Sequence, residues 1–167
     1  MPTAHTPVDG LVLETARKIT GNEQDPLKKA RLIYEWVSSH MERDNDVIGC
    51  GTGDVAEILK SGKLKGKCTD MSSVFVALAR ASGIPARELF GIRLGKANKL
   101  ERYSKSAFGK ADSAGVADVS GGQHCRAEFY LAGYGWLPCD PADVTKMRLA
   151  EKKSHQDADV QAVNTYL

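Results

Sequence analysis

Three residues in this chain have side chains that together can break an amide bond: Cys68, His124 and Asp140. A thiolate can attack an amide carbonyl, an imidazole can take the thiol proton and return it to the leaving amine, and a carboxylate can orient the imidazole. This chemistry needs no metal ion. The three residues lie far apart in the sequence, so it depends on the elements that bring them together.

Cys68 is predicted to lie at the start of a helix, directly after the turn formed by Gly66 and Lys67. The free N–H groups and positive dipole end of a helix N-terminus favour a thiolate there. Gly83 and Pro85 end the helix. The spacing of a half-buried helix is followed by Met71, Val74, Phe75 and Leu78. On Cys68 alone, a buried structural cysteine is the more common outcome, and the choice depends on residues later in the chain.

His124 and Asp140 fall on a predicted hairpin, with strands over 123–131 and 136–140 and a turn over 132–135. A turn centred near residue 132 sets His124 opposite Asp140, and opposed residues share a face of the sheet. An imidazole–carboxylate hydrogen bond is therefore expected. The alternatives are a surface histidine on a strand and an aspartate that caps the helix beginning at Pro141. The coincidence of all three residue types favours the catalytic interpretation.

The other face of the same hairpin is uniformly apolar. The register that pairs His124 with Asp140 also sets Cys125 opposite Cys139, and it is supported by the burial of this face. Both cysteines are expected to be buried and packed as small apolar residues. Whether they form a disulfide is left open. Which face of the sheet meets the Cys68 helix also stays open, because His124 and Asp140 point away from the apolar side.

The remaining segments supply the framework. The N-terminal residues 1–9 are a loose lead-in that lacks the hydrophobic core of a signal peptide. The long segment 95–122 is poor in apolar periodicity and leads into His124, so it is expected to border the cleft and, being basic, to favour acidic peptides. The pattern further predicts helices over 10–20, 26–40 and 55–60 and a strand over 88–94. Toward the C-terminus it predicts a helix that starts at 141, within a charged segment that runs to 158, and a strand-like end over 160–167.

Composition limits the classes of function. The 167 residues are enough for one domain, and 42% hydrophobic and 26% charged residues are typical of a globular protein. A net charge of +2 without a basic run argues against nucleic acid as a partner, and no apolar stretch is long enough for membrane insertion. The four cysteines at 50, 68, 125 and 139 form no CxxC pair, so no zinc ribbon or thioredoxin motif is present.

The motifs around these residues resemble those of the bacterial transglutaminase-like superfamily. The similarity runs over about residues 25–145 and includes Gly-Lys-Cys-Thr-Asp-Met at 66–71, His-Cys-Arg-Ala-Glu-Phe-Tyr at 124–130 and Gly-Trp-Leu-Pro-Cys-Asp-Pro at 135–141. It implies a single α+β domain over 1–167 with a papain-like core, in which N-terminal helices and the nucleophile helix pack on an antiparallel sheet.

The resemblance also implies roles for individual residues: Cys68 as nucleophile, His124 as base and Asp140 as the orienting carboxylate. Arg126 departs from the pattern, since many relatives have an aromatic residue two positions after the histidine. Relatives are often exported to the periplasm and carry an extra N-terminal domain. The backbone N–H of Cys68 is expected to donate to the oxyanion, and Gln123 is one candidate for the second donor.

The expected function is thiol-dependent acyl transfer on peptide or glutamine-type amides through a cysteine thioester, without a cofactor or metal. Hydrolysis is favoured over transfer to an amine, because 7% aromatic residues offer little to wall off water. Two other classes remain open. One is a metal-binding module using Cys68, His124, Asp140 and His155. The other is a non-catalytic peptide-binding domain of the same fold. The oligomeric state is also open.

Overall fold

The computed structural model describes residues 2–92, 112–116, 122–152, 154 and 156–164. Most of the segment predicted to border the cleft, 95–122, lies outside the described residues. The elements in chain order are α1 (Gly10–Thr20), α2 (Pro26–His40), β1 (Glu42–Arg43), α3 (Val55–Ser61), β2 (Lys65–Gly66), α4 (Cys68–Ala81), β3 (Ala86–Ile92), β4 (Gln123–Leu131), β5 (Gly135–Cys139), α5 (Pro141–Glu151) and α6 (Ala158–Asn164).

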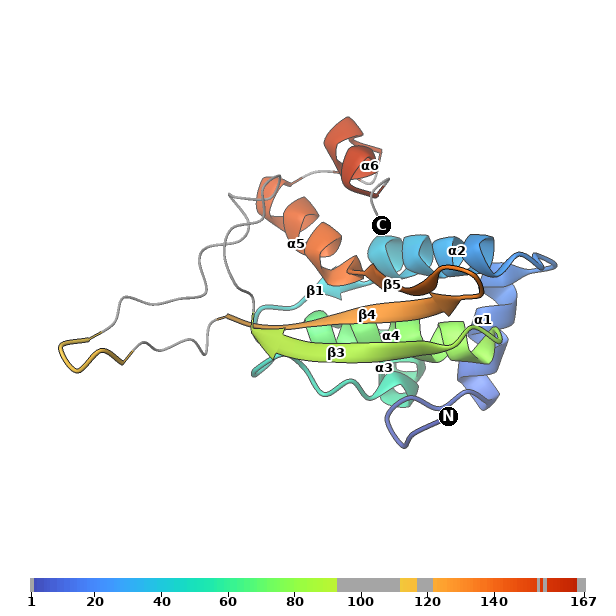
Figure 1. Ribbon diagram of the computed structural model, residues 1–167, viewed down its shortest axis with the longest axis horizontal. Coiled ribbons are helices and arrows are strands. Elements are labelled where there is room, and N and C mark those ends of the chain that lie inside the picture. Colours follow the sequence, from blue (N-terminus) through green and yellow to red (C-terminus); the bar gives the residue numbers. More distant parts are fainter. Residues whose placement is uncertain (1, 93–111, 117–121, 153, 155, 165–167) are drawn as a thin grey trace.

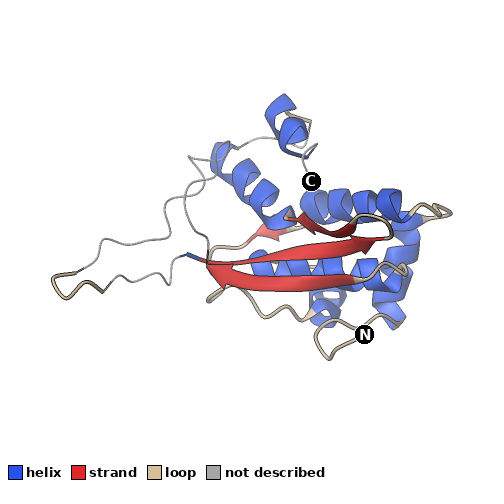
Figure 2. Ribbon diagram, in the orientation of Figure 1, coloured by secondary structure: helices blue, strands red, loops and turns tan. Residues whose placement is uncertain are grey.

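Helix α4 is the centre of the molecule, with the sheet on one side and helices on the others (Figure 1). It contacts β3 and β4 on the sheet side, and α1, α2, α3 and α5 elsewhere. Every residue from 68 to 79 is buried. The helix is therefore buried on more sides than the predicted half-buried helix, because other helices cover the side that the apolar spacing left to solvent. The α+β class, with this helix packed on an antiparallel sheet, is confirmed (Figure 2).

The sheet has the order β3-β4-β5 and is antiparallel throughout. Its hairpin turn contains three residues, 132–134, and Gly133 adopts a φ of 85° within it. The observed register pairs Leu131 with Gly135 and Ala127 with Cys139. The predicted register was wrong by two residues. A shift of two leaves every side chain on its predicted face, since side chains alternate with period two.

The two cysteines of the hairpin are buried as predicted, with exposed fractions of 3% for Cys125 and 2% for Cys139. They are not opposed, because Cys125 pairs with Phe90 on β3 and Cys139 pairs with Ala127 on β4. All four cysteines of the chain are free thiols. The predicted direct pairing of Cys125 and Cys139 was therefore wrong.

Aspartate side chains cap the first turns of two helices in the N-terminal part of the chain. Asp25 accepts hydrogen bonds from the backbone N–H groups of Leu27 and Lys28 at the start of α2, and Asp54 accepts one from Glu57 at the start of α3. The C-terminal prediction was wrong, since Ala158–Asn164 is helix α6 and not a strand. Its Val160 is fully buried. No helix in the described part of the chain is both long and apolar enough to cross a bilayer.

Candidate active site

Cys68 is the first residue of α4 and is 6% exposed. The start of this helix is held by Asp70, a buried carboxylate with an exposed fraction of 4%. Its Oδ2 accepts a hydrogen bond of 2.8 Å from the backbone N–H of Lys67, and its Oδ1 accepts bonds of 3.0 and 2.9 Å from those of Thr52 and Gly53. Asp70 thus fastens both the helix start and the preceding loop around Cys68.

Two glycines make this arrangement possible. A Cβ atom on Gly51 would lie 2.0 Å from the Asp70 carboxylate, and one on Gly66 would lie 2.3 Å from it. Gly51 also has a φ of 102°, which side chains rarely tolerate. The carboxylate can therefore reach the backbone N–H groups only because both positions lack a side chain.

His124 and Asp140 form a hydrogen-bonded pair. The distance between His124 Nε2 and Asp140 Oδ2 is 2.5 Å, and both side chains are largely buried, with exposed fractions of 18% and 16%. The other oxygen of Asp140 accepts a bond of 3.0 Å from the backbone N–H of Asp143 and so caps α5. Asp140 therefore both bonds to the imidazole and caps the helix, with a different oxygen for each partner.

The two residues come together with Cys68 at one end of the sheet. Helix α4 packs on the apolar face, where Phe75 lies against Phe129 with ring centroids 6.1 Å apart and Ser72 Oγ donates to the Cys125 carbonyl. His124 is the second residue of β4, and Asp140 follows directly after β5. This answers the question left open by the pattern. The helix covers the apolar face, and the polar residues meet its N-terminus at the strand ends.

Cys68 and His124 shift each other's ionisation. Burial opposes ionisation of the thiol, but hydrogen bonding to His124 and to the backbone of Cys125, together with the charge of His124, lowers the pKa of Cys68 to about 7. Burial likewise disfavours the imidazolium, yet the bonds to Asp140 and Cys68 raise the pKa of His124 to about 9. Near neutral pH the pair therefore favours a thiolate beside an imidazolium.

Two further thiols lie beside Cys68. The Sγ atoms of Cys50, Cys68 and Cys125 are all within 4.8 Å of one another. Cys125 Sγ is 3.1 Å from Thr69 Oγ1, and burial raises the pKa of Cys125 to about 12. Sequence reasoning missed Cys50 as a neighbour of Cys68. The only signal was its place in the glycine-rich run 49–53, which indicates a tight loop but no partner.

The described residues contain two groups with the donor types of a metal site. One is the thiol cluster of Cys50, Cys68 and Cys125, and the other joins His124 and Asp140 to Asp143, whose Oδ1 lies 3.9 Å from His124 Nε2. Of the residues expected to form one metal module, Cys68 belongs to the first group, and His124 and Asp140 belong to the second. His155, the fourth ligand of that alternative, lies outside the described residues.

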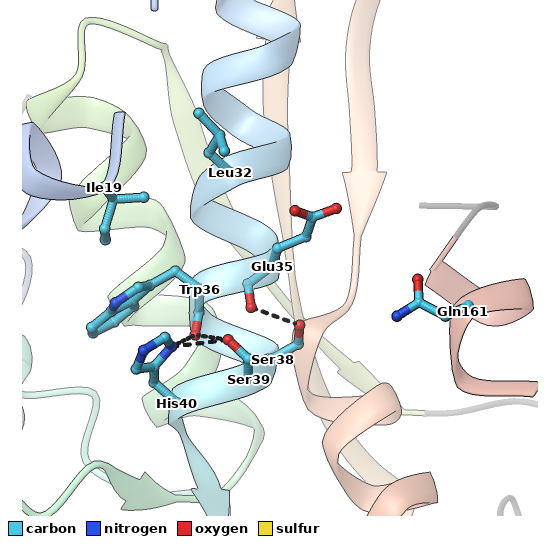
Figure 3. Close-up of a pocket in the computed structure, with 8 residues that line it drawn as sticks. All are labelled: Ile19, Leu32, Glu35, Trp36, Ser38, Ser39, His40 and Gln161. Atoms are coloured by element: carbon cyan, nitrogen blue, oxygen red, sulfur yellow. Dashed lines mark hydrogen bonds between the residues drawn. The ribbon is translucent and has the colours of Figure 1, made fainter. Parts of the chain in front are cut away.

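The structure also has an open pocket of about 440 Å³ elsewhere, between α1, α2 and α6 (Figure 3). Trp36 and His40 stack in it, with ring centroids 4.9 Å apart, and His40 Nδ1 lies 2.9 Å from Ser39 Oγ. None of Cys68, His124 and Asp140 lines this pocket. It is therefore separate from the candidate active site.

Comparison with known proteins agrees with this architecture. A protein of Haemophilus influenzae described as uncharacterized is 67% identical over 165 residues, which cover 99% of this chain and 45% of that protein. The chain thus spans less than half the length of that relative.

Two solved structures share the fold. A candidate cysteine protease from Cytophaga hutchinsonii has a TM-score of 0.60 at 22% identity, over 85% of this chain and 40% of that one. The periplasmic domain of TgpA from Pseudomonas aeruginosa has a TM-score of 0.59 at 16% identity, over 97% and 49%. A sequence model of the transglutaminase-like superfamily matches residues 13–141. The chain belongs to the transglutaminase-like superfamily.

Proposed function

We propose that this domain is a cysteine-dependent acyl-transfer enzyme that acts on peptide or glutamine-type amides. The observation that carries the proposal is that His124 is hydrogen-bonded to Asp140 and lies near enough to the buried Cys68 thiol to lower its pKa. Each residue sits at the end of a regular element, α4, β4 or β5, which holds it in position. Sites on such elements are more rigid than sites on free loops.

In this proposal the Cys68 thiolate attacks the amide carbonyl and forms a tetrahedral intermediate. The backbone N–H of Cys68, at the helix start, is the expected first donor to the oxyanion. The His124 imidazolium then protonates the leaving amine, which leaves Cys68 as a thioester. Neutral His124 next activates the incoming water or amine, and Asp140 keeps the imidazole oriented through both steps.

We further propose that water is the usual acceptor, so that the enzyme is a peptidase or amidase. Excluding water requires apolar walls around the thioester. The aromatic candidates Tyr130 and Trp136 pack on each other, with ring centroids 5.6 Å apart. Tyr130 lies six residues along β4 from His124, which corresponds to about 20 Å in a strand. These rings are therefore too far away to shield a thioester on Cys68.

The test is a measurement of product partition. The enzyme is incubated with a glutamine-bearing peptide and a primary amine at millimolar concentration, and the free acid and the amine adduct are counted by mass spectrometry. We expect mainly acid from the wild type and neither product from Cys68→Ala, with Cys139→Ser as a control that keeps activity. If most of the product is the amine adduct, the reaction is transglutamination and not hydrolysis. Turnover by Cys68→Ala would overturn the whole proposal.

A periplasmic site of action is proposed on the likeness to the TgpA domain, which is periplasmic in Pseudomonas aeruginosa. The protein that contains this domain should then be found outside the cytoplasm. Fractionation of cells that carry an epitope tag inside this domain measures this. Recovery of the tag with the cytoplasmic fraction would contradict it.

A further inference from the structure

Cys50 takes no part in the proposed acyl transfer, yet its thiol lies within 4.8 Å of the Cys68 thiol. We propose that Cys50 is a resolving cysteine, which converts oxidised Cys68 into a reversible Cys50–Cys68 disulfide. The proposal rests on the reactivity of Cys68 as a thiolate. It does not require that the domain cleave an amide.

The surroundings of Cys50 suit this role. Cys50 is only partly buried and lies in a loop between Gly49 and Gly51, which have φ values of 64° and 102°. Its carbonyl accepts a 3.0 Å hydrogen bond from the backbone N–H of Thr69, so the loop is fixed against the first turn of α4. Because the two main chains are held side by side, we expect rotation of the two side chains to bring the sulfur atoms to the roughly 2.05 Å of a disulfide.

Cys125 is the competing partner, and its environment disfavours it. It lies within the central strand β4, paired with Phe90 on β3, and its thiol is engaged with Thr69 Oγ1. Burial raises the pKa of both thiols, but Cys125 is only 3% exposed, whereas Cys50 is only partly buried. Cys50 is therefore the more accessible of the two neighbours.

The chemistry needs a two-electron oxidant, for which hydrogen peroxide is the probe. The Cys68 thiolate attacks one peroxide oxygen, the O–O bond breaks, and Cys68 becomes a sulfenic acid while the departing hydroxide takes a proton to form water. The sulfur of Cys50 then attacks the sulfenyl sulfur, and the hydroxyl group leaves with the Cys50 proton as a second water. Two thiols lose two electrons in total, and peroxide gains them.

The consequence is protection of the nucleophile. A sulfenic acid without a resolving thiol is oxidised further to a sulfinic acid, which ordinary thiols do not reduce. A disulfide instead stops the oxidation and is reversed by a reductant. The domain would be inactive while oxidised and would regain a free Cys68 when reduced.

The experiment compares the wild type with Cys50→Ser, and uses Cys125→Ser and Cys139→Ser as matched controls. Each protein is treated with peroxide and then with dithiothreitol, and Cys68 is quantified by alkylation and peptide mass mapping. We expect the wild type to lose two hydrogen atoms, to yield a Cys50–Cys68 cross-linked peptide and to regain alkylation of Cys68 after reduction. Both control variants should behave in the same way, whereas Cys50→Ser should lose the recovery and accumulate sulfinic acid.

Two results would overturn the inference: a cross-link between Cys68 and Cys125, or full recovery of Cys68 in Cys50→Ser. If Cys50→Ser does not fold, Cys50→Ala serves the same comparison, and peptide mapping of the wild type alone still decides which thiols are joined. All readouts follow the thiols and need no substrate. If the protein forms the disulfide but cleaves no amide, the proposed function is wrong and the inference about Cys50 still holds.

Discussion

At the level of single residues, Asp140 serves two partners through separate oxygens: Oδ2 bonds to His124 and Oδ1 caps helix α5. Asparagine also caps helices well, so Asp140→Asn retains the cap while removing the negative charge next to the imidazole. Alanine removes both. The pair of variants therefore separates the proposed role of Asp140 in catalysis from its contribution to folding.

We expect Asp140→Asn to lower kcat/KM by about 10²- to 10⁴-fold with little change in stability. Loss of the carboxylate should also lower the pKa of His124, because the bond to Asp140 is what raises it. Asp140→Ala should lose about 1 kcal/mol of folding free energy in addition. Urea titrations and pH–rate profiles measure these effects. Equal activity of the wild type and the asparagine variant would remove Asp140 from the mechanism.

The ionisation of Cys68 and His124 predicts the pH dependence of the wild type. Below about pH 7 the Cys68 thiol is protonated and attacks poorly, so kcat/KM should rise with pH through that value. Above about pH 9 His124 loses its proton and cannot protonate the leaving amine, so kcat/KM should fall. A bell-shaped profile is expected. A rate that keeps rising beyond pH 10 would contradict the thiolate–imidazolium pair.

At the level of elements, the start of α4 depends on Asp70. Asp70→Ala leaves the backbone N–H groups of Lys67, Thr52 and Gly53 without their acceptor. Hydrogen bonds to a buried charge contribute about 1.5–3 kcal/mol each, and partial rehydration offsets some of that.

We therefore expect Asp70→Ala to lower the free energy of unfolding by about 2–4 kcal/mol. Because the loop carrying Cys50 is released, formation of the Cys50–Cys68 disulfide should slow as well. Chemical denaturation and the peroxide assay measure the two effects. The exposed Asp46 provides the control, since Asp46→Ala should leave both unchanged. A variant as stable as the control would mean that Asp70 is not the fastening residue.

Most of the helices and strands that carry the site could be predicted from the sequence. How they lie relative to one another could be predicted only in part. The helix after Cys68 was predicted from apolar spacing and its glycine and proline stop, which are local signals. The hairpin faces were predicted as well, but its register was not. Two registers that differ by two residues bury the same side chains, and the choice depends on a three-residue turn around Gly133.

Other features depend on tertiary packing that no local pattern records. Cys50 lies beside Cys68 because Asp70 accepts hydrogen bonds from Thr52 and Gly53 in the following loop, and because the Cys50 carbonyl accepts one from the backbone N–H of Thr69. The two-residue strands β1 and β2 pair in parallel, with Glu42 opposite Lys65, although they lie far apart in the sequence. The end at 160–167 was expected to be a strand, because a short apolar run does not distinguish strand from helix. There the buried Val160 belongs to helix α6.

At the level of the whole molecule, stability comes from the core around α4. Phe75 is fully buried and packs against Phe129 of the sheet. We expect Phe75→Ala to lower the free energy of unfolding by about 3–5 kcal/mol, because it leaves a cavity between helix and sheet. Leu27→Ala, at a position that is 51% exposed, should change it by less than about 0.5 kcal/mol. Urea titration compares them, and similar losses would contradict the central place of α4.

We propose above all that the fold makes Cys68 a nucleophile with the help of His124. The most direct measurement is the rate of Cys68 alkylation by iodoacetamide against pH, in the wild type and in His124→Gln. In the wild type, Cys68 should react fastest of the four cysteines, with an apparent pKa of about 7. In His124→Gln the pKa should rise above that of an ordinary thiol, because burial is then less opposed. If Cys68 is labelled no faster than Cys50, and its pH profile is the same in both proteins, then Cys68 is not a nucleophile activated by His124.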